Sequence, residues 1–324
     1  MIRKVNIMDE DWDYLVILDA CRYDYFYKLY RKYLHGKLEM IISSGSTTVQ
    51  WCNKSFQGKY DDVVYISANP IINSKVKIKG FSAKDHFHKV VDVWSYCWNE
   101  KLGTVHPEKV NQVTLNLKNT EFFSSKRLII HYLQPHAPYI GQIHSRHGFP
   151  RPQIYSNRVL TGIDGDSHNR STVEEILNRF APILDGGTRF FIGNLSWKIR
   201  ELLNLPPASP MDAVRRMAGN QGLREAYLEN LRLVLECVNG LVENLSGKIV
   251  ITSDHGELLG ERGRYSHFAE SSDPLLVEVP WLRVAKPRAR VCLNARLERK
   301  IGEEKRETEF ETEIRQRLKS LGYF

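Results

Sequence analysis

The stretch Ile251–Glu257 reads ITSDHGE. Its first three residues are the end of the largely apolar run Lys248–Ser253. A short apolar run that ends in polar, chemically capable residues is typical of a buried strand in a parallel sheet. Asp254 and His255 follow this strand directly and offer one carboxylate oxygen and one imidazole nitrogen. Such mixed ligand sets suit Zn²⁺ or Mn²⁺. The stretch therefore predicts a metal site at the end of a strand.

A second segment of the same kind lies near the start of the chain. The run DYLVILD, Asp13–Asp19, is short and apolar and ends in an acid, and aromatic side chains then recur at helical spacing through Cys21–Tyr33. This order indicates a strand, a tight turn and a helix. Sites in open α/β sheets lie at the carboxyl ends of the strands, and Asp19 lies at such an end.

Two further apolar runs, Val63–Ser67 and Arg127–Leu133, are also followed by polar residues. Asn69 comes after the first run and His136 after the second. One polar strand end is unremarkable, but four of them indicate a single rim at one edge of a sheet. We therefore predict an α/β fold with a mostly parallel central sheet sandwiched between helices.

The longest predicted helix is Leu223–Leu245, whose apolar side chains fall on one stripe. It leads directly into the last predicted strand, so we expect a crossover helix packed on the sheet. Residues 140–220 contain Pro-, Gly- and Asn-rich stretches around a short helix at 172–184, and we interpret them as an insertion over the site. The predicted organisation is one catalytic domain over 1–290, followed over 291–324 by a basic segment and an amphipathic helix.

The composition is that of an ordinary globular protein, with 42% hydrophobic and 26% charged residues. No stretch approaches the roughly 18 consecutive apolar residues of a membrane helix, and the charged start of the chain lacks a signal-peptide core. The 5 cysteines include no CxxC pair, which argues against a disulfide framework. We expect a cytoplasmic chain whose net charge of +8 favours anionic partners. Nucleic acid is not expected among them, since no nucleic-acid-binding motif is visible.

Taken together, these motifs resemble the alkaline phosphatase/sulfatase superfamily. TSDHGE, with His267 after a glycine-containing loop, is similar to its metal-binding segment, especially in the branch of phosphoethanolamine transferases and lipoteichoic acid synthases. LVILDACR at Leu15–Arg22 resembles its first strand, SSGSTTVQW at Ser43–Trp51 its nucleophile turn, and QPHAPY at Gln134–Tyr139 its substrate-side histidine segment. The sequence LDACRYD also resembles a segment of soluble archaeal and bacterial sulfatase-like proteins. The resemblance spans about residues 13–282 and implies an alkaline phosphatase-like fold.

The resemblance also implies roles for single residues. Thr48 would be the nucleophile, with Thr47 as the second choice, and Arg22 could pair with a substrate anion as a two-pronged donor. His136 and His267 would bind substrate or a second metal. The expected catalytic residues are Thr48, His136, His267 and Arg22, and the expected metal ligands are Asp19, Thr48, Asp254 and His255. One divalent ion is expected, Zn or Mn before Ca or Mg, and a second ion stays open.

The implied function is metal-dependent cleavage or transfer of phosphoesters or phosphodiesters through a threonine-linked intermediate. Metal coordination would lower the pKa of the threonine hydroxyl, and a helix N-terminus would present N–H groups to the phosphate. The expected substrate is an anionic small molecule, a glycan or a lipid head group. Sulfoester hydrolysis and non-catalytic binding of an anionic glycan are the alternatives. The choice between hydrolase and transferase stays open, as does the oligomeric state.

Two departures from the family narrow these alternatives. Sulfatases of the formylglycine type carry a Cys/Ser-x-Pro-x-Arg motif, and the sequences after Cys21 and Cys52 lack its proline. Sulfate esters are therefore the less favoured substrates. Two-metal phosphatases place an Asp four residues before a His, whereas Tyr132 stands at that place before His136. We therefore expect one firmly held metal and at best a loosely held second one on His136 and His267.

Overall fold

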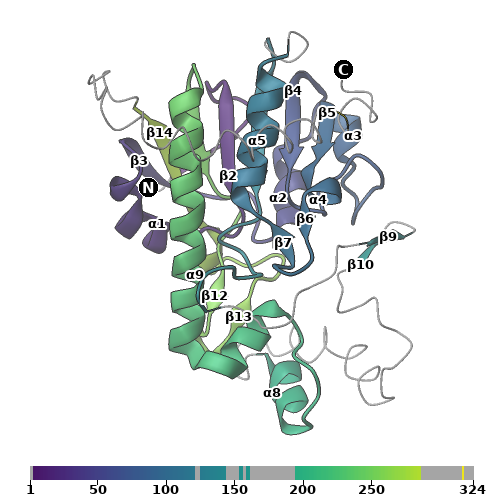
Figure 1. Cartoon of the computed structure of the whole chain (residues 1–324), viewed down its shortest axis with the longest axis vertical. Coiled ribbons are helices and arrows are strands. Elements are labelled where there is room, and N and C mark those ends of the chain that lie inside the picture. Colours follow the sequence, from purple (N-terminus) through teal and green to yellow (C-terminus); the bar gives the residue numbers. More distant parts are fainter. Residues whose placement is uncertain are drawn as a thin grey trace.

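The computed structural model describes residues 3–120, 125–143, 153–155, 158–160, 194–285 and 316. At its centre lies a sheet of 8 strands in the order β1-β3-β14-β11-β2-β8-β4-β5 (Figure 1). Strand β14 runs antiparallel to both neighbours, and the other neighbouring pairs are parallel. This topology confirms the predicted mostly parallel sheet. The strands are β1 (Arg3–Lys4), β2 (Tyr14–Leu18), β3 (Gly36–Ile42), β4 (Tyr60–Ser67), β5 (Phe87–Asp92), β8 (Arg127–Tyr132), β11 (Ile249–Thr252) and β14 (Glu278–Val284).

Helices cover both faces of this sheet, as predicted. Helices α5 and α9 lie over the face nearest the viewer in Figure 1, and α2 lies behind the sheet. The helices are α1 (Tyr23–Leu29), α2 (Thr48–Ser55), α3 (Ala83–His86), α4 (Val93–Tyr96), α5 (Pro107–Lys118), α8 (Leu195–Leu202), α9 (Pro210–Asn244) and α10 (Pro274–Val277), with short 3-10 turns at Tyr30–Lys32 and Glu261–Gly263. Three small hairpins complete the described elements: β6 (Trp98–Asn99) with β7 (Thr104–Val105), β9 (Gln153–Tyr155) with β10 (Arg158–Leu160), and β12 (Leu258–Leu259) with β13 (Tyr265–Ser266).

The alternation of side chains along β2 explains why the strand reads as one continuous apolar run. Val16 and Leu18 point into the core shared with α5 and α9, whereas Leu15 and Ile17 point into the core shared with α2. All four side chains are completely buried. A strand covered on both faces has no solvent side on which polar residues would be favourable.

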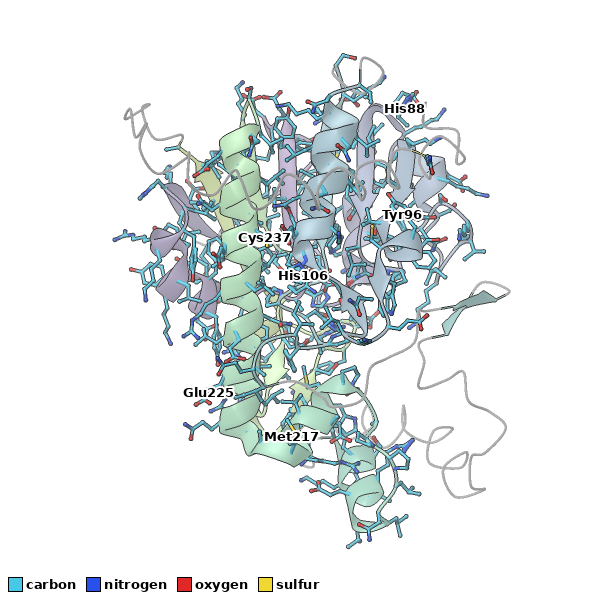
Figure 2. All side chains as sticks on the ribbon, in the orientation of Figure 1. His88, Tyr96, His106, Met217, Glu225 and Cys237 are labelled. Carbon is cyan, nitrogen blue, oxygen red and sulfur yellow. The ribbon has the colours of Figure 1, made fainter. Side chains whose placement is uncertain are left out.

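Helix α9 is longer than the sequence predicts. It begins at Pro210 rather than at Leu223, after Ser209, whose side chain accepts a hydrogen bond from Asp212 N. A kink at Gly219, with φ of 67°, joins its two parts. Figure 2 shows Cys237 on the part of α9 beside the sheet and Met217 on the part that extends beyond the sheet. The insertion expected up to residue 220 therefore overlaps the start of this helix.

Two other predicted helices, at 172–184 and near the C-terminus, lie outside the described residues apart from residue 316. In the central sheet, strands β1, β3, β5 and β14 were not predicted. Strand β14 contains Pro280, which is unfavourable in a central strand. Among the described residues, no helix combines the length and the apolar character needed to span a membrane.

Tyr227 of α9 provides a test of how this helix holds the turn after β2. Its buried hydroxyl donates to Ala20 O at 2.8 Å and accepts from Arg22 N at 2.9 Å. Tyr227→Phe leaves both backbone groups unpaired, so we expect the free energy of unfolding to fall by about 1–3 kcal/mol. Chemical denaturation measures this change. Tyr27→Phe, at a side chain 56% exposed, is the matched control, with an expected change within about 0.5 kcal/mol; equal effects would contradict the role of the buried hydroxyl.

Candidate metal and nucleophile site

The predicted rim exists, because the four strands concerned are neighbours in the order β11-β2-β8-β4. Their carboxyl ends bring Asp19 and Asn69 into contact, and Asn69 Nδ2 donates to Asp19 Oδ2 at 2.6 Å. Asp254 and His255 follow β11 beside them, since His255 Nε2 lies 3.8 Å from Asp19 Oδ1. All four side chains are buried. Segments far apart in the sequence therefore meet at a single site.

The carboxylate of Asp254 lies at the centre of this site. Its Oδ1 accepts hydrogen bonds from Ala20 N at 3.0 Å and from His255 N at 2.9 Å, and its Oδ2 accepts from Thr48 Oγ1 at 2.8 Å. Burial by itself would raise the pKa of Asp254, but the neighbouring imidazoles of His255 and His131 and these hydrogen bonds hold it below its ordinary value. The group is thus kept as an anion.

The hydrogen bonds of His255 define which of its ring nitrogens faces the site. Its Nδ1 lies 2.8 Å from Gly256 O. Since a carbonyl oxygen can only accept, Nδ1 carries the proton and Nε2 keeps its lone pair. This Nε2 lies 3.3 Å from Asp254 Oδ2 and 3.2 Å from Thr48 Oγ1. A neutral imidazole with a free Nε2 is the form in which histidine binds metals.

The structure gives the two adjacent threonines different positions. Thr47 is the N-cap of α2, and its Oγ1 accepts from Gln50 N at 3.3 Å. Thr48 is the first residue of the helix, is buried, and points its hydroxyl at Asp254 and His255. Capping therefore occupies Thr47 and leaves Thr48 facing the candidate metal ligands.

The donor set around Thr48 fits a divalent cation. Asp19 Oδ1 is buried and has no hydrogen-bond partner. Ligand atoms of Asp19, His131 and Asp254 lie within 4.8 Å of one another, and His255 Nε2 is close to both carboxylates. Two buried carboxylates and neutral imidazoles are ligands that suit Zn²⁺ or Mn²⁺. Without a cation the carboxylates are unfavourable neighbours, and burial, followed by the charge of Asp254, raises the pKa of Asp19 well above its ordinary value.

A second group of ligands lies beside the first and consists of His136, Glu257 and His267. His267 Nδ1 lies 2.9 Å from Glu257 Oε1, and His136 Nε2 lies 3.7 Å from Glu257 Oε2. The rings of His255 and His267 are 4.2 Å apart between centroids, so the two groups adjoin. Burial raises the pKa of Glu257 to about 7 and lowers that of His267 to about 4. The two histidines predicted for a loosely held second metal thus lie beside a third, buried candidate ligand, Glu257.

Sequence reasoning missed two members of these groups, Glu257 and His131. Glu257 stands two residues after His255 in the ITSDHGE stretch, so its position was visible although no role was assigned to it. His131 lies inside β8, where it is completely buried, and Tyr65 OH lies 2.7 Å from its Nδ1. The signal in the sequence that could have identified His131 as a candidate ligand was its place in a strand that is otherwise largely apolar. Burial lowers the pKa of His131 to about 4, so it too is a neutral imidazole.

Arg22, for which a substrate contact is predicted, is held by protein partners in this structure. Its guanidinium forms ion pairs with Asp24 at 2.8 Å and with Glu261 at 2.6 Å. It also donates to Glu257 O at 3.3 Å and is almost completely buried. These bonds tie the start of α1 to the segment that carries Glu257. Arg22 therefore has the contacts of a positioning residue.

The sequence matches no protein-family model and no curated protein. In structure, the chain is similar to the soluble domain of lipooligosaccharide phosphoethanolamine transferase A from Neisseria meningitidis, at 13% identity and a TM-score of 0.44, over 84% of this chain and 76% of that one. It is also similar to the C-terminal periplasmic domain of EcEptC from Escherichia coli in complex with Zn, at 11% identity and a TM-score of 0.42, over 87% of this chain and 77% of that one.

A third similar structure is the phosphonate monoester hydrolase SpPMH from Silicibacter pomeroyi, at 13% identity and a TM-score of 0.37, over 85% of this chain and 68% of that one. At these identities the function has to be argued from the site itself.

Removal of a ligand from the first group should release metal. We expect Asp254→Asn and His255→Ala to lose most of the bound metal, because each deletes an atom that faces Thr48 and Asp19. Elemental analysis of the purified variants measures this loss. His35→Ala, at an exposed histidine, is the control and should keep the wild-type content. If both site variants keep the full metal content, Asp254 and His255 are not the metal ligands.

Substitutions in the second group should act on turnover instead. We expect His136→Ala, His267→Ala and Glu257→Gln to lower kcat and to leave the metal at Asp19, Asp254 and His255 in place, because none of the three belongs to that group. Metal content and kcat are measured on the same preparations. Loss of all metal in any of these variants would show that the two groups are not independent.

Proposed function

We propose that this chain is a metal-dependent enzyme that hydrolyses phosphoesters or phosphodiesters, or transfers their phosphoryl group, through a covalent intermediate on Thr48. The observation that carries the proposal is the position of Thr48 Oγ1, 2.8 Å from Asp254 Oδ2 and 3.2 Å from His255 Nε2 at the start of α2. A hydroxyl that is held against metal-binding side chains and a helix N-terminus suits nucleophilic attack on phosphorus.

Asp19, Asp254 and His255, together with Thr48 itself, would hold the metal. A divalent cation bound there would lower the pKa of the Thr48 hydroxyl and neutralise charge on the phosphoryl group. The hydroxyl proton already points toward Asp254 Oδ2, which orients the oxygen lone pairs away from that carboxylate. The first N–H groups of α2 have no partners within the helix. That of Gln50 donates to the Thr47 hydroxyl, so those of Thr48 and Val49 would meet phosphoryl oxygens.

The proposed reaction has two steps. In the first, Thr48 Oγ bonds to phosphorus and the bond from phosphorus to the leaving alcohol breaks; the alcohol leaves with a proton. In the second, water or another alcohol attacks the same phosphorus and the bond to Thr48 Oγ breaks, which restores the hydroxyl. His136 and His267 lie with Glu257 next to His255, where they can contact the substrate and exchange protons with it.

The substrate in this proposal is an anionic small molecule, a glycan phosphate or a lipid head group. A panel of phosphate monoesters, phosphodiesters and sulfate esters, each with Zn²⁺, Mn²⁺ or Mg²⁺ added separately, tests the reaction class. Metal-dependent release of alcohol from a phosphoester supports the proposal. Turnover confined to sulfate esters, or no turnover of any ester, would count against it.

The nucleophile is tested by the adjacent pair of threonines. Thr48→Ala removes the attacking oxygen, and we expect kcat to fall by about 10³ or more, on the scale of losing a covalent nucleophile, with an unchanged circular dichroism spectrum. Thr48→Ser keeps the hydroxyl and should retain partial activity. Thr47→Ala is the matched control, because it removes only the cap of α2 and should reduce stability by about 1 kcal/mol.

Acid quench during turnover, followed by mass spectrometry, should locate the substrate-derived group on residue 48. If the group is found on residue 47 instead, Thr47 is the nucleophile. Full activity of both alanine variants would leave direct attack by water as the mechanism.

A further inference from the structure

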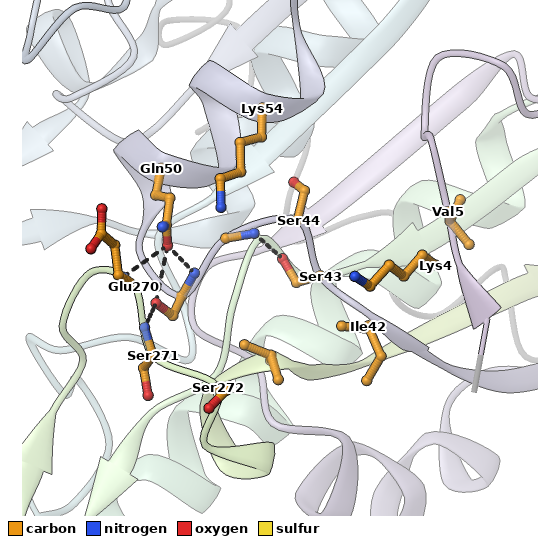
Figure 3. Close-up of a pocket in the computed structure, with 13 residues that line it drawn as sticks. Lys4, Val5, Ile42, Ser43, Ser44, Gln50, Lys54, Glu270, Ser271 and Ser272 are labelled. Atoms are coloured by element: carbon orange, nitrogen blue, oxygen red, sulfur yellow. Dashed lines mark hydrogen bonds between the residues drawn. The ribbon is translucent and has the colours of Figure 1, made fainter. Parts of the chain in front are cut away.

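A hollow opens beside the proposed nucleophile and extends away from it. Its volume is about 560 Å³, and Thr48 and His267 line it. Gln50, Lys54 and Glu270 line this hollow and also a second one of about 630 Å³, which Figure 3 shows. The two hollows therefore adjoin, and a substrate bound at Thr48 has room to extend toward Lys54.

Gln50 presents hydrogen-bond donors to this space. Its Oε1 accepts from Ser46 N at 2.9 Å, from Ser46 Oγ at 3.1 Å and from Glu270 N at 3.3 Å (Figure 3). Because two of these partners are backbone N–H groups, the atom they meet is the amide oxygen. The NH₂ group of Gln50 is therefore directed away from the loops and is free to meet an acceptor in the hollow.

Two lysines add positive charge to the same space. Lys54 and Lys79 both line the hollow beside Thr48, and Asn53 Nδ2 donates to Lys79 O at 3.3 Å, which ties the Lys79 loop to α2. Within the described residues, neither ammonium group has a carboxylate in ion-pair contact. Glu270 is the one carboxylate among the described lining residues. Two cations facing one anion around a shared hollow favour a negatively charged occupant.

Figure 3 also shows the direction of the charges in the second hollow. The side chains of Lys54 and Lys4 both extend toward the serine-rich turn at Ser43 and Ser44. Hydroxyl groups and ammonium groups thus line the second hollow, which lies beyond Lys54 as seen from Thr48. This lining is polar and suits a hydrated, oxygen-rich group rather than an apolar chain.

We infer that Lys54, Lys79 and the NH₂ group of Gln50 form a subsite for a second anionic group of the substrate. The inference rests on the proposed phosphoryl chemistry at Thr48 and specifies its substrate class. Thr48 and Lys54 belong to the same helix and lie roughly 9 Å apart along its axis at 1.5 Å per residue, a span that a short substrate linker and the flexible lysine side chain cover together. The substrate is thus a phosphoester that carries a further phosphate or carboxylate, not one whose other end is a cationic amine.

The test uses three p-nitrophenyl phosphodiesters that differ only in the second alcohol: 2-carboxyethyl, ethyl and 2-aminoethyl. We expect the wild-type protein to show the highest kcat/KM for the carboxyethyl ester. Lys54→Gln and Lys79→Gln should each lower the ratio of carboxyethyl to ethyl kcat/KM by about tenfold or more, the scale of one lost charge-assisted contact. Lys32→Gln removes the same charge from an exposed lysine outside both hollows and should leave the ratio unchanged.

The outcomes of this test distinguish a failure of the proposed subsite from a failure of the proposed phosphoryl chemistry. If the esters are turned over but the ratio is the same in all variants, or if the aminoethyl ester is preferred, the subsite is refuted and the proposed function stands. If no ester is turned over, calorimetry with glycerol 3-phosphate and 3-phosphoglycerate decides. Tighter binding of 3-phosphoglycerate that is lost in the Lys54 and Lys79 variants supports the subsite, and equal binding of the two ligands refutes it.

Discussion

The buried carboxylate of Asp254 imposes the constraint on which the rest of this structure depends. A carboxylate without partners is costly inside a protein, by several kcal/mol even after relaxation. Here it accepts bonds from Ala20 N, His255 N and Thr48 Oγ1. The donors belong to the turn after β2, to the segment after β11 and to the first turn of α2. These three segments must therefore take up their native positions together before the Asp254 carboxylate has all three hydrogen bonds.

The turn after β2 bears the strain of this arrangement. Ala20 has a φ of 56°, in the left-handed region, which costs roughly 1–2 kcal/mol for a residue with a Cβ. The conformation aims its N–H at Asp254. Ser253 Oγ, which accepts from Cys21 N at 2.7 Å, and Tyr227 on α9 hold the turn from two sides. Packing of a distant helix thus maintains the backbone geometry from which Ala20 N donates to Asp254.

Close packing also places the second group of ligands next to the first. A Cβ on Gly256 would lie 2.0 Å from Leu275 O, so only glycine allows the chain to pass α10 at this distance. Its N–H donates to Leu276 O at 2.9 Å. This contact fixes the short path between His255 and Glu257, so residues two positions apart contribute to the two adjoining ligand groups. Arg22 holds the far side of the same path through Glu257 O.

The sequence alone determined the parallel strands and the residues at their carboxyl ends. A short apolar run that ends in a polar residue favours a strand buried on both faces, and the polar residue that follows such a strand lies at the sheet edge. The positions of Asp19, Asp254 and His255 at strand ends were predictable for this reason, and the pair Thr47 and Thr48 was predictable as the start of a helix. The local pattern could not reveal β3 and β14, whose antiparallel pairing joins segments at opposite ends of the chain.

The tertiary structure alone decided which side chains share the site. The Ala20 to Asp254 hydrogen bond joins residues 234 positions apart, and no periodicity in the sequence encodes such a contact. The same holds for His131, whose direction depends on Tyr65 and β4, and for Glu257, whose role depends on His136 reaching it from another strand end. The ion pairs of Arg22 with Asp24 and Glu261 are likewise set by the fold. Strand ends are a local property of the chain, whereas ligand geometry is a property of segments that meet only after folding.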